Sequence, residues 1–414
     1  MNRKLSIRWS KEWAIAILFF GPQINYYLAS LLSMNNRQTL TVPVYVILYG
    51  IGAFSYLKVL GHKKCFISLV ILAASLILSI LINGGVVQHM LSGYLYSSGL
   101  IVLLFAYFPV FLLLVDGVDF NKLMRISRGF CHAALIVALF TFGRYIIIRK
   151  TTPSDYMSFA YMMMSPILFC FIQGTEGSLW DLILSALGGF IILIVGCRGA
   201  VISIAVFFLL YMLGYYMPKG GKGVGIRKLL VILLIVAVAV FSEQILTLIS
   251  YGLNRVGLTS RTVNKLIAGS GAFIESEGRQ AIWRQALENI GFFGKGLFGD
   301  RTVIINEYGQ ATYAHNLLLE IMVDFGLAVG VAVLICFIVL FIRAYKYSLK
   351  MGSSLLIKVT FVMISIVFAK HMISTSFLTS FDFWFYFGLA VCIVTNRDKI
   401  MQSGHGMIEK ENAQ

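Results

Sequence analysis

The chain has 414 residues, of which 59% are hydrophobic and only 13% are charged. A soluble domain is typically about 25% charged, so the composition excludes an ordinary soluble protein and indicates an all-α polytopic membrane protein. The net charge of +16 at pH 7 is expected to reside in loops that set the topology and attract anionic lipid headgroups, and no nucleic-acid partner is expected.

Apolar runs near the length that crosses a bilayer recur from one end of the chain to the other. We expect about twelve transmembrane helices, near residues 13–33, 40–60, 66–83, 99–115, 129–148, 156–173, 180–196, 200–217, 229–249, 317–342, 355–373 and 383–396. If the N-terminus is cytoplasmic, the cytoplasmic segments hold 19 Lys and Arg residues and the five short outer loops hold 4. This asymmetry predicts cytoplasmic termini, and the basic start without a small-residue cleavage site predicts no removable signal peptide.

The expected spans divide the chain into four parts. Residues 1–249 form a membrane domain with spans one to nine, 250–314 a large outer loop, 315–396 a membrane domain with spans ten to twelve, and 397–414 a cytoplasmic tail. Structureless loops longer than about 12–15 residues are uncommon, and this one contains the helix-like stretch GRQAIWRQALENI. We therefore expect the loop to be folded and partly helical.

Neither the cysteines nor the histidines have the spacing of a metal site. The six cysteines lie in apolar segments without a C-x-x-C pair, so we expect buried thiols rather than disulfides. No H-x-x-x-H pair or cluster of carboxylates with histidine is present along the sequence. We expect no metal and no cofactor.

Arg198 is the first candidate site residue along the chain. It lies in GCRGA at 196–200, between two apolar segments, and its flanking glycines allow a ligand or another backbone to approach closely. The alternative is a turn residue that snorkels to the membrane surface. The expected topology places this turn on the outer side, where basic residues are disfavoured, so a binding role for Arg198 stays open beside the structural one.

Arg279 and Trp283 lie four residues apart in the helix-like part of the outer loop, so they share a helix face. A guanidinium held beside a ring near a helix N-terminus could bind phosphate. The alternative is an amphipathic surface helix in which Arg279 pairs with Glu275 or Glu277.

The stretch YAHNLLLEIMVDFG at 313–326 places polar residues where the outer loop re-enters the membrane. His315 can be neutral near pH 7 and can accept or pass on a proton. Asn316, Glu320 and Asp324 follow at intervals of four and line one side of a helix, and ionisable residues at such positions indicate function or a partner. The two acids could instead cap the helix or brace it against the arginines of the loop.

These residues together resemble the bacterial Wzy/WaaL superfamily of O-antigen and capsule polymerases and ligases. The shared pattern covers about residues 180–345: an Arg-Gly at a span junction, Arg-x-x-x-Trp in the outer loop, and H-[NSQ]-x9-G-x-x-[GTV] entering the next span. The last motif is satisfied by His315, Asn316, Gly326 and Val329.

The resemblance implies a GT-C-like, metal-independent glycosyltransferase of the bacterial inner membrane that uses glycans carried on undecaprenyl diphosphate. It implies that Arg198 and Arg279 bind the diphosphate and that His315 orients or deprotonates the attacking hydroxyl. The wider binding set would include Trp283, Arg284, Asn316 and Glu320. Membrane lipids are expected partners, with a chain-length regulator and a flippase as further ones.

Three functions follow as alternatives. The first is a polymerase of O-antigen or capsule repeat units, favoured by the acid five residues after His315 and by GFFGKGLFGD before it. The second is an O-antigen ligase that transfers the glycan to lipid A core, because the His-Asn motif fits the ligases as well. The third is a lipid-linked oligosaccharide flippase, which predicts internal repeats and charges spread over many spans.

Overall fold

The computed structural model describes residues 10–32, 38–92, 99–149, 153, 155–216, 242–255, 257, 263–264, 267 and 277–396. The described part is almost entirely helical, and its one β-pairing is an isolated bridge between Ile305 and Ala311. The expected tail at 397–414 and most of expected span nine lie outside the described residues.

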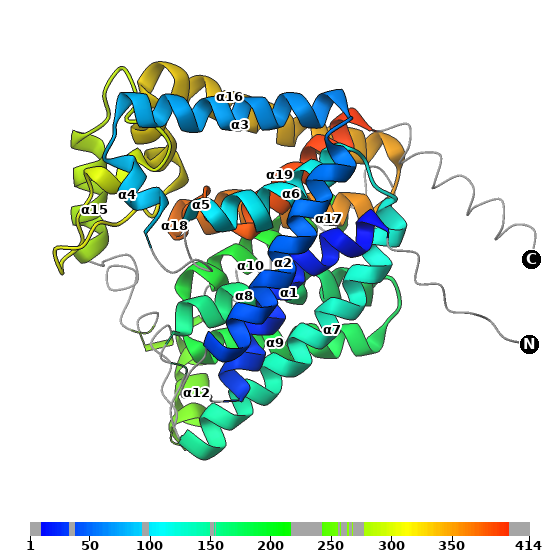
Figure 1. The fold of residues 1–414 in the computed structure, drawn as a ribbon. Helices are drawn as coiled ribbons and strands as arrows, with labels where there is room; N and C mark the ends of the chain where they lie inside the picture. Colours follow the sequence, from blue (N-terminus) through cyan, green and yellow to red (C-terminus); the bar gives the residue numbers. More distant parts are fainter. Residues whose placement is uncertain are drawn as a thin grey trace, which may run out of the picture.

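The long helices of the first half alternate in direction and form the larger part of the bundle (Figure 1). They are α1 (Lys11–Leu31), α2 (Gln38–Val59), α3 (Lys63–Ile82), α5 (Gly99–Val102) continued by η1 (Leu103–Tyr107) and α6 (Phe108–Val115), α7 (Phe120–Arg144) continued by η2 (Tyr145–Arg149), α8 (Tyr156–Thr175), α9 (Leu179–Val195) and α10 (Arg198–Tyr211) continued by η3 (Met212–Tyr216). The short α4 (Val86–Met90) follows α3.

The second half supplies the outer loop and the remaining helices. They are α12 (Ser242–Arg255), α15 (Glu277–Glu288), η4 (Gly299–Thr302), α16 (Leu317–Met351), α17 (Ser354–Ile364), η5 (Ser365–Lys370), α18 (His371–Ile373) and α19 (Phe381–Thr395). Helix α12 continues to Arg255, five residues beyond the expected start of the loop at 250, whereas α16 begins at the expected residue 317.

Among the described residues, seven helices are long and apolar enough to cross a membrane, and four shorter apolar helices coincide with expected spans. The all-α polytopic fold is therefore confirmed. The bundle centre is aromatic: Phe19 of α1 stacks on Phe385 of α19 with ring centroids 3.9 Å apart. The hydroxyl of Tyr27 donates to the carbonyl of Phe159, 2.7 Å away, and joins α1 to α8.

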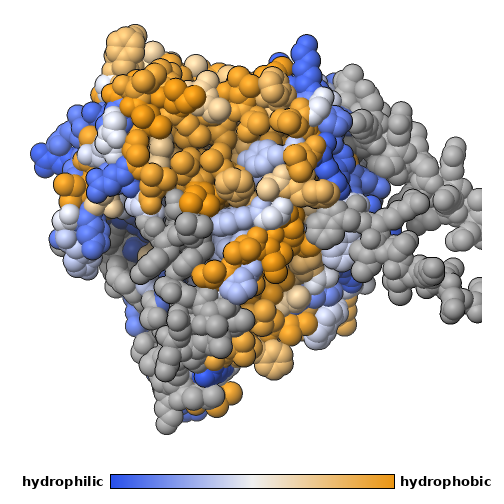
Figure 2. All heavy atoms as spheres, in the orientation of Figure 1, coloured by the Kyte–Doolittle hydropathy of each residue, from blue (hydrophilic) through white to orange (hydrophobic). Residues whose placement is uncertain are grey.

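Helices α3 and α16 are mostly exposed and form an apolar outer face, unlike the largely buried α1 and α8. Figure 2 shows this apolar surface over the upper part of the molecule. α16 packs on α17 and α19, while α3 contacts α6. Apolar outer faces of this kind are suited to contact with lipid.

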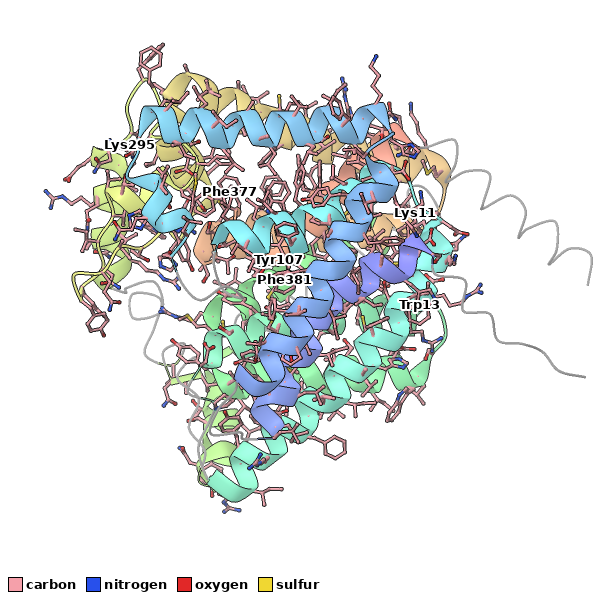
Figure 3. The ribbon with its side chains drawn as sticks, in the orientation of Figure 1. Lys11, Trp13, Tyr107, Lys295, Phe377 and Phe381 are labelled. Carbon is pink, nitrogen blue, oxygen red and sulfur yellow. The ribbon has the colours of Figure 1, made fainter. Side chains whose placement is uncertain are left out.

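The outer loop is fastened to α3. Ser79 accepts a hydrogen bond from the N–H of Leu297 at 2.7 Å, and the amide of Asn83 donates to Thr302 at 3.0 Å. Lys295 accordingly lies beside one end of α3, and Lys11 lies at the opposite end of the bundle (Figure 3). The loop therefore occupies one end of the helical bundle.

Helix α16 is broken at Gly326, whose φ of 76° and ψ of 172° favour glycine. A break frees backbone groups that need partners in a membrane. Residues 291–296 supply them through four bonds: Lys295 N to Val323 O (3.0 Å), Gly296 N to Asp324 O (2.9 Å), Leu327 N to Gly291 O (2.9 Å) and Ala328 N to Phe292 O (3.5 Å). The outer loop thus supplies hydrogen-bond partners to the backbone groups that the break at Gly326 leaves free.

Candidate functional site

A cavity of about 430 Å³ opens where the outer loop meets the bundle. Four segments build it: the start of α8, the start of α15, residues 306–315, and the turn after α18. The lining residues are Asp155, Met157, Ser158, Tyr161, Gly278, Arg279, Ile282, Asn306, Glu307, Tyr308, Thr312, Tyr313, His315, Ser374 and Thr375. Arg279 and His315, which belong to two separate sequence motifs, therefore face one space.

Arg279 lies in the first turn of α15 and is half-buried in the cavity wall. No ion pair or hydrogen bond joins its guanidinium to the side chains that the structure describes; Glu275 and the side chain of Glu277 are not among them. Its charge acts on His315 and Tyr313 across the cavity, and on Tyr161. A partly desolvated guanidinium without a described carboxylate partner is suited to a ligand anion.

Trp283 and Arg284 do not line the cavity. Trp283 packs into a small apolar cluster made by Ile282, Ala286, Ile304, Ala314 and Val323, so it fastens α15 to the loop and to α16. Among the described cation–π contacts of the loop, the cations are Arg255 and Arg301 rather than Arg279. Arg284 is exposed and pairs with Glu288 at 2.9 Å. Binding roles for Trp283 and Arg284 stay predictions that this geometry does not favour.

Arg198 begins α10 directly behind one wall of the cavity. Gly196 ends α9 in the left-handed region at φ 85°, and Cys197 precedes the new helix. Gly199 lies so close to the hydroxyl of Tyr161 that a Cβ atom would overlap it, and Tyr161 lines the cavity. Arg198 itself is half-buried and is not a lining residue. The expectation that Arg198 binds the diphosphate stays a prediction.

His315 adopts a left-handed backbone conformation, with φ 52°, at the entry to α16. This region is unusual for a residue with a side chain. The imidazole lies 3.9 Å from the ring of Tyr313 between centroids, and its Nε2 is 3.4 Å from Thr312 Oγ1. One nitrogen of the His315 ring, the buried Nδ1, has no hydrogen-bond partner among the described residues.

Burial and charge keep the His315 imidazole neutral. The pKa of His315 is lowered to about 4, first because the ring is buried and then because Arg279 and Arg301 repel a positive charge. Burial likewise raises the pKa of Tyr313 to about 12. Near pH 7 the cavity therefore presents a guanidinium, a neutral imidazole and a neutral phenol.

Asp300 holds the chain immediately before His315. It is fully buried, and its Oδ2 accepts a hydrogen bond from the N–H of Ala314 at 3.0 Å. The N–H of Asp300 in turn donates to Asp324 Oδ1 at 2.9 Å. Burial raises the pKa of Asp300, although Arg301, 3.7 Å away, opposes this. Asp324 therefore braces the loop, but through the backbone of Asp300 instead of through an arginine.

Glu320 and Asn316 also form hydrogen bonds that position the backbone of neighbouring segments. Glu320 is fully buried and accepts hydrogen bonds from the Ser376 hydroxyl and from the N–H of Phe377, the latter at 3.2 Å. Asn316 caps α16 by accepting from the N–H groups of Leu318 and Leu319, and its amide donates to Met372 O. Both residues position cavity-lining segments; their contact with substrate stays a prediction.

A small hairpin at residues 305–311 forms the rim of the cavity. It is closed by the bridge between Ile305 and Ala311, and Asn306 Oδ1 accepts from the N–H groups of Tyr308 and Gln310. Glu307 and Tyr308 are exposed at its tip and line the cavity. A carboxylate and an aromatic ring are groups that can bind sugar hydroxyls and sugar faces.

Two groups of described residues bring potential metal ligands together. The ligand atoms of Asp300, Glu320 and Asp324 lie within 4.8 Å of one another, as do those of His132, Cys170 and Asp181. In the first group four of the six oxygens accept hydrogen bonds from the protein. In the second, Asp181 binds Arg128 at 2.6 Å and His132 at 2.5 Å. The expectation of a metal-independent protein stays a prediction.

Sequence reasoning missed Asp300, Tyr161 and the turn at Ser374 and Thr375. Asp300 stood in GKGLFGD at 294–300, which reads as a loop turn. Asp300 lies between Gly299 and Arg301, so the local sequence carried no signal for a buried role. Tyr161 had no signal either, because a tyrosine in an apolar span is ordinary.

Comparison with known families covers the part of the chain that builds this site. Residues 183–334 match the family model described as O-antigen ligase. The match covers 152 of the 414 residues, so this region of the chain is similar to the Wzy/WaaL superfamily. No curated protein matches the chain.

The matched region contains Arg198, Arg279, His315 and Gly326, so it includes all three sequence motifs. Members of the family are membrane glycosyltransferases or ligases, and their substrates are lipid-linked glycans. With its apolar helices, the protein is an integral protein of the inner membrane.

Proposed function

We propose that the protein is a polysaccharide polymerase that joins undecaprenyl-diphosphate-linked repeat units into O-antigen or capsule chains on the outer face of the inner membrane. The observation that carries this proposal is that Arg279, without a described carboxylate partner, and neutral His315 face the same cavity. An anion and a reacting hydroxyl can therefore be held together in one space. Both termini would be cytoplasmic, as the loop charges indicate.

The reaction requires one bond to form and one to break at the anomeric carbon of the donor. The acceptor hydroxyl oxygen attacks this carbon, and the diphosphate leaves with the electron pair of the broken C–O bond. Arg279 binds the leaving diphosphate by charge-assisted hydrogen bonds, assisted by Arg198 behind the cavity wall. Fixed guanidinium groups would take the place of a divalent metal.

His315 would orient the acceptor hydroxyl and take its proton. Its pKa of about 4 makes it a weak base, because burial and two arginines disfavour the imidazolium. A bound diphosphate would offset the arginine charges and raise this pKa. The base would therefore strengthen when the donor is in place.

The ligase alternative has equal support from the family match. The matching family is described as O-antigen ligase, and the H-N-x9-G-x-x-V spacing fits the ligases. A flippase is less compatible with the cavity, since Arg279 and His315 lie at one end of the bundle. The resemblance of residues 313–326 to repeat-unit polymerases favours the polymerase.

A chromosomal deletion separates these functions. Extracted glycans would be run on a gel that resolves lipid-linked repeat units, free polymer and core-attached polymer. A polymerase deletion leaves single repeat units on core without a ladder. A full ladder that remains on undecaprenyl diphosphate would identify the ligase, and repeat units trapped on the cytoplasmic side would identify the flippase.

A further inference from the structure

Two exposed phenylalanines lie in the segment that repairs the break in α16. Phe292 and Phe293 have exposed fractions of 65% and 83%, and their rings meet edge to face with centroids 5.1 Å apart. We call residues Gly291–Gly294 the aromatic finger. Its backbone is fixed, because Gly291 O and Phe292 O accept from the N–H groups of Leu327 and Ala328. The exposed rings are therefore held in place and do not belong to a loose loop end.

The position of the break along α16 locates the finger relative to the membrane. Residues 326–342 contain no charged side chain, and Asp324 and Arg343 stand on either side of this run. At about 1.5 Å per residue the run spans roughly 25 Å, close to the hydrocarbon thickness of about 30 Å. Gly326 thus lies near the outer boundary of the hydrocarbon, and so does the finger that bonds to residues 327 and 328.

The surroundings of the finger match a lipid interface. Leu327 and Val329, directly after the break, are about half exposed and continue the outward apolar face of α16. Lys295 follows the finger and lies beside the end of α3 (Figure 3), where an ammonium group suits lipid phosphates. Two exposed phenyl rings joined to a lipid-facing helix would be unfavourable in water.

We infer that the aromatic finger inserts into the outer leaflet, with the acyl chains of bilayer lipids as its partner, and so fixes the outer loop at a set depth. A continuous series of contacts leads from the finger to the cavity. Gly296 N donates to Asp324 O, the Asp324 carboxylate accepts from Asp300 N, and the Asp300 carboxylate accepts from Ala314 N, next to His315. The inference depends on α16 spanning the membrane and is independent of the proposed glycan chemistry.

The first test measures the depth of the finger directly. Cys336, the exposed native cysteine, is replaced by serine, and an environment-sensitive fluorophore is attached through Phe293→Cys in vesicles that contain lipids with shallow nitroxide groups. The matched control is Tyr308→Cys, at a residue 77% exposed on the cavity rim of the same loop. We expect blue-shifted emission and several-fold stronger quenching at 293 than at 308. Equal, water-like emission and weak quenching at both positions would overturn the insertion.

The second test addresses the connection to the cavity. Phe292→Ser with Phe293→Ser should raise amide hydrogen exchange in a peptide that contains Ala314 and His315, whereas the apolar pair Phe292→Leu with Phe293→Leu should not. Both pairs keep the backbone bonds of the finger. Unchanged exchange in the serine variant, with normal insertion, would show that lipid contact does not hold the loop.

Discussion

The buried carboxylate of Asp300 accepts a hydrogen bond from the N–H of Ala314 at 3.0 Å, and it thereby fixes the peptide that leads into His315. His315 itself has a positive φ, so its position depends on neighbours that resist relaxation. Asp300 is accordingly a positioning residue for the imidazole, although no motif includes it.

Replacing Asp300 by alanine should lower both stability and activity. Loss of the acceptor leaves the Ala314 N–H buried without a partner, which costs about 1–3 kcal/mol. Thermal unfolding of the purified protein and glycan ladders in a complemented deletion strain measure the two effects. Glu288→Ala, which removes an exposed carboxylate of the same loop, should change neither. An Asp300→Ala protein as stable and active as the parent would show that this bond is dispensable.

Alanine substitutions of Arg279 and Arg284 should differ sharply in their effect on polymer formation. Arg279→Ala should reduce polymer formation by about 10²–10³-fold, the usual effect of losing one charge-stabilising donor. Arg279→Lys should recover little, because an ammonium does not reproduce the planar fork of arginine. Arg284→Ala should retain near-normal ladders, since Arg284 is exposed and paired with Glu288. Equal losses at 279 and 284 would contradict the placement of the anion site in the cavity.

The lowered pKa of His315 predicts a pH-dependent stability with a definite sign. Between about pH 6.5 and 4 an unfolded histidine binds a proton while folded His315 stays neutral. The unfolded state then binds more protons, so stability falls as the pH drops through this window and levels off below it. His315→Asn, which tolerates positive φ, should remove this part of the decrease in melting temperature. If His315→Asn instead follows the parent through this window, the imidazole is not held neutral.

The break in α16 should tolerate no side chain. Gly326→Ala places a Cβ against the backbone of the aromatic finger at a positive φ, and we expect a loss above about 1 kcal/mol. Gly189→Ala in α9 has no atom within 4 Å of its added Cβ and should be neutral or stabilising. The comparison uses melting temperature and the amount of inserted protein. A neutral Gly326→Ala would mean that the helix can run straight through this position.

The fold was predictable because hydropathy alone determines which segments cross a membrane. The helix in the outer loop was also predictable, since residues 278–290 have helical periodicity and α15 covers Glu277–Glu288. Local spacing could place Arg279 and Trp283 on one helix, but tertiary packing decided their neighbours: Trp283 faces an apolar cluster and Arg279 faces the cavity.

The internal bonding of the site could not be predicted from spacing. Asp324 reaches the backbone of Asp300, 24 residues away, and Glu320 reaches Phe377, 57 residues away. Such pairs depend on how the loop folds back onto α16. The sequence identified Gly326 as part of the His-Asn motif. Its role in breaking α16 became clear only from the four hydrogen bonds that residues 291–296 form on either side of it.

The hairpin at 305–311 is closed by the Asn306 side chain and by its own bridge, and Ile305 at its base exchanges two hydrogen bonds with the side chain of Gln285 in α15. Its tip can therefore be exchanged without rebuilding the frame that holds Arg279 and His315. Under the proposed function, exchanging this short turn between related proteins should change which sugars are accepted, with Arg279 and His315 left in place.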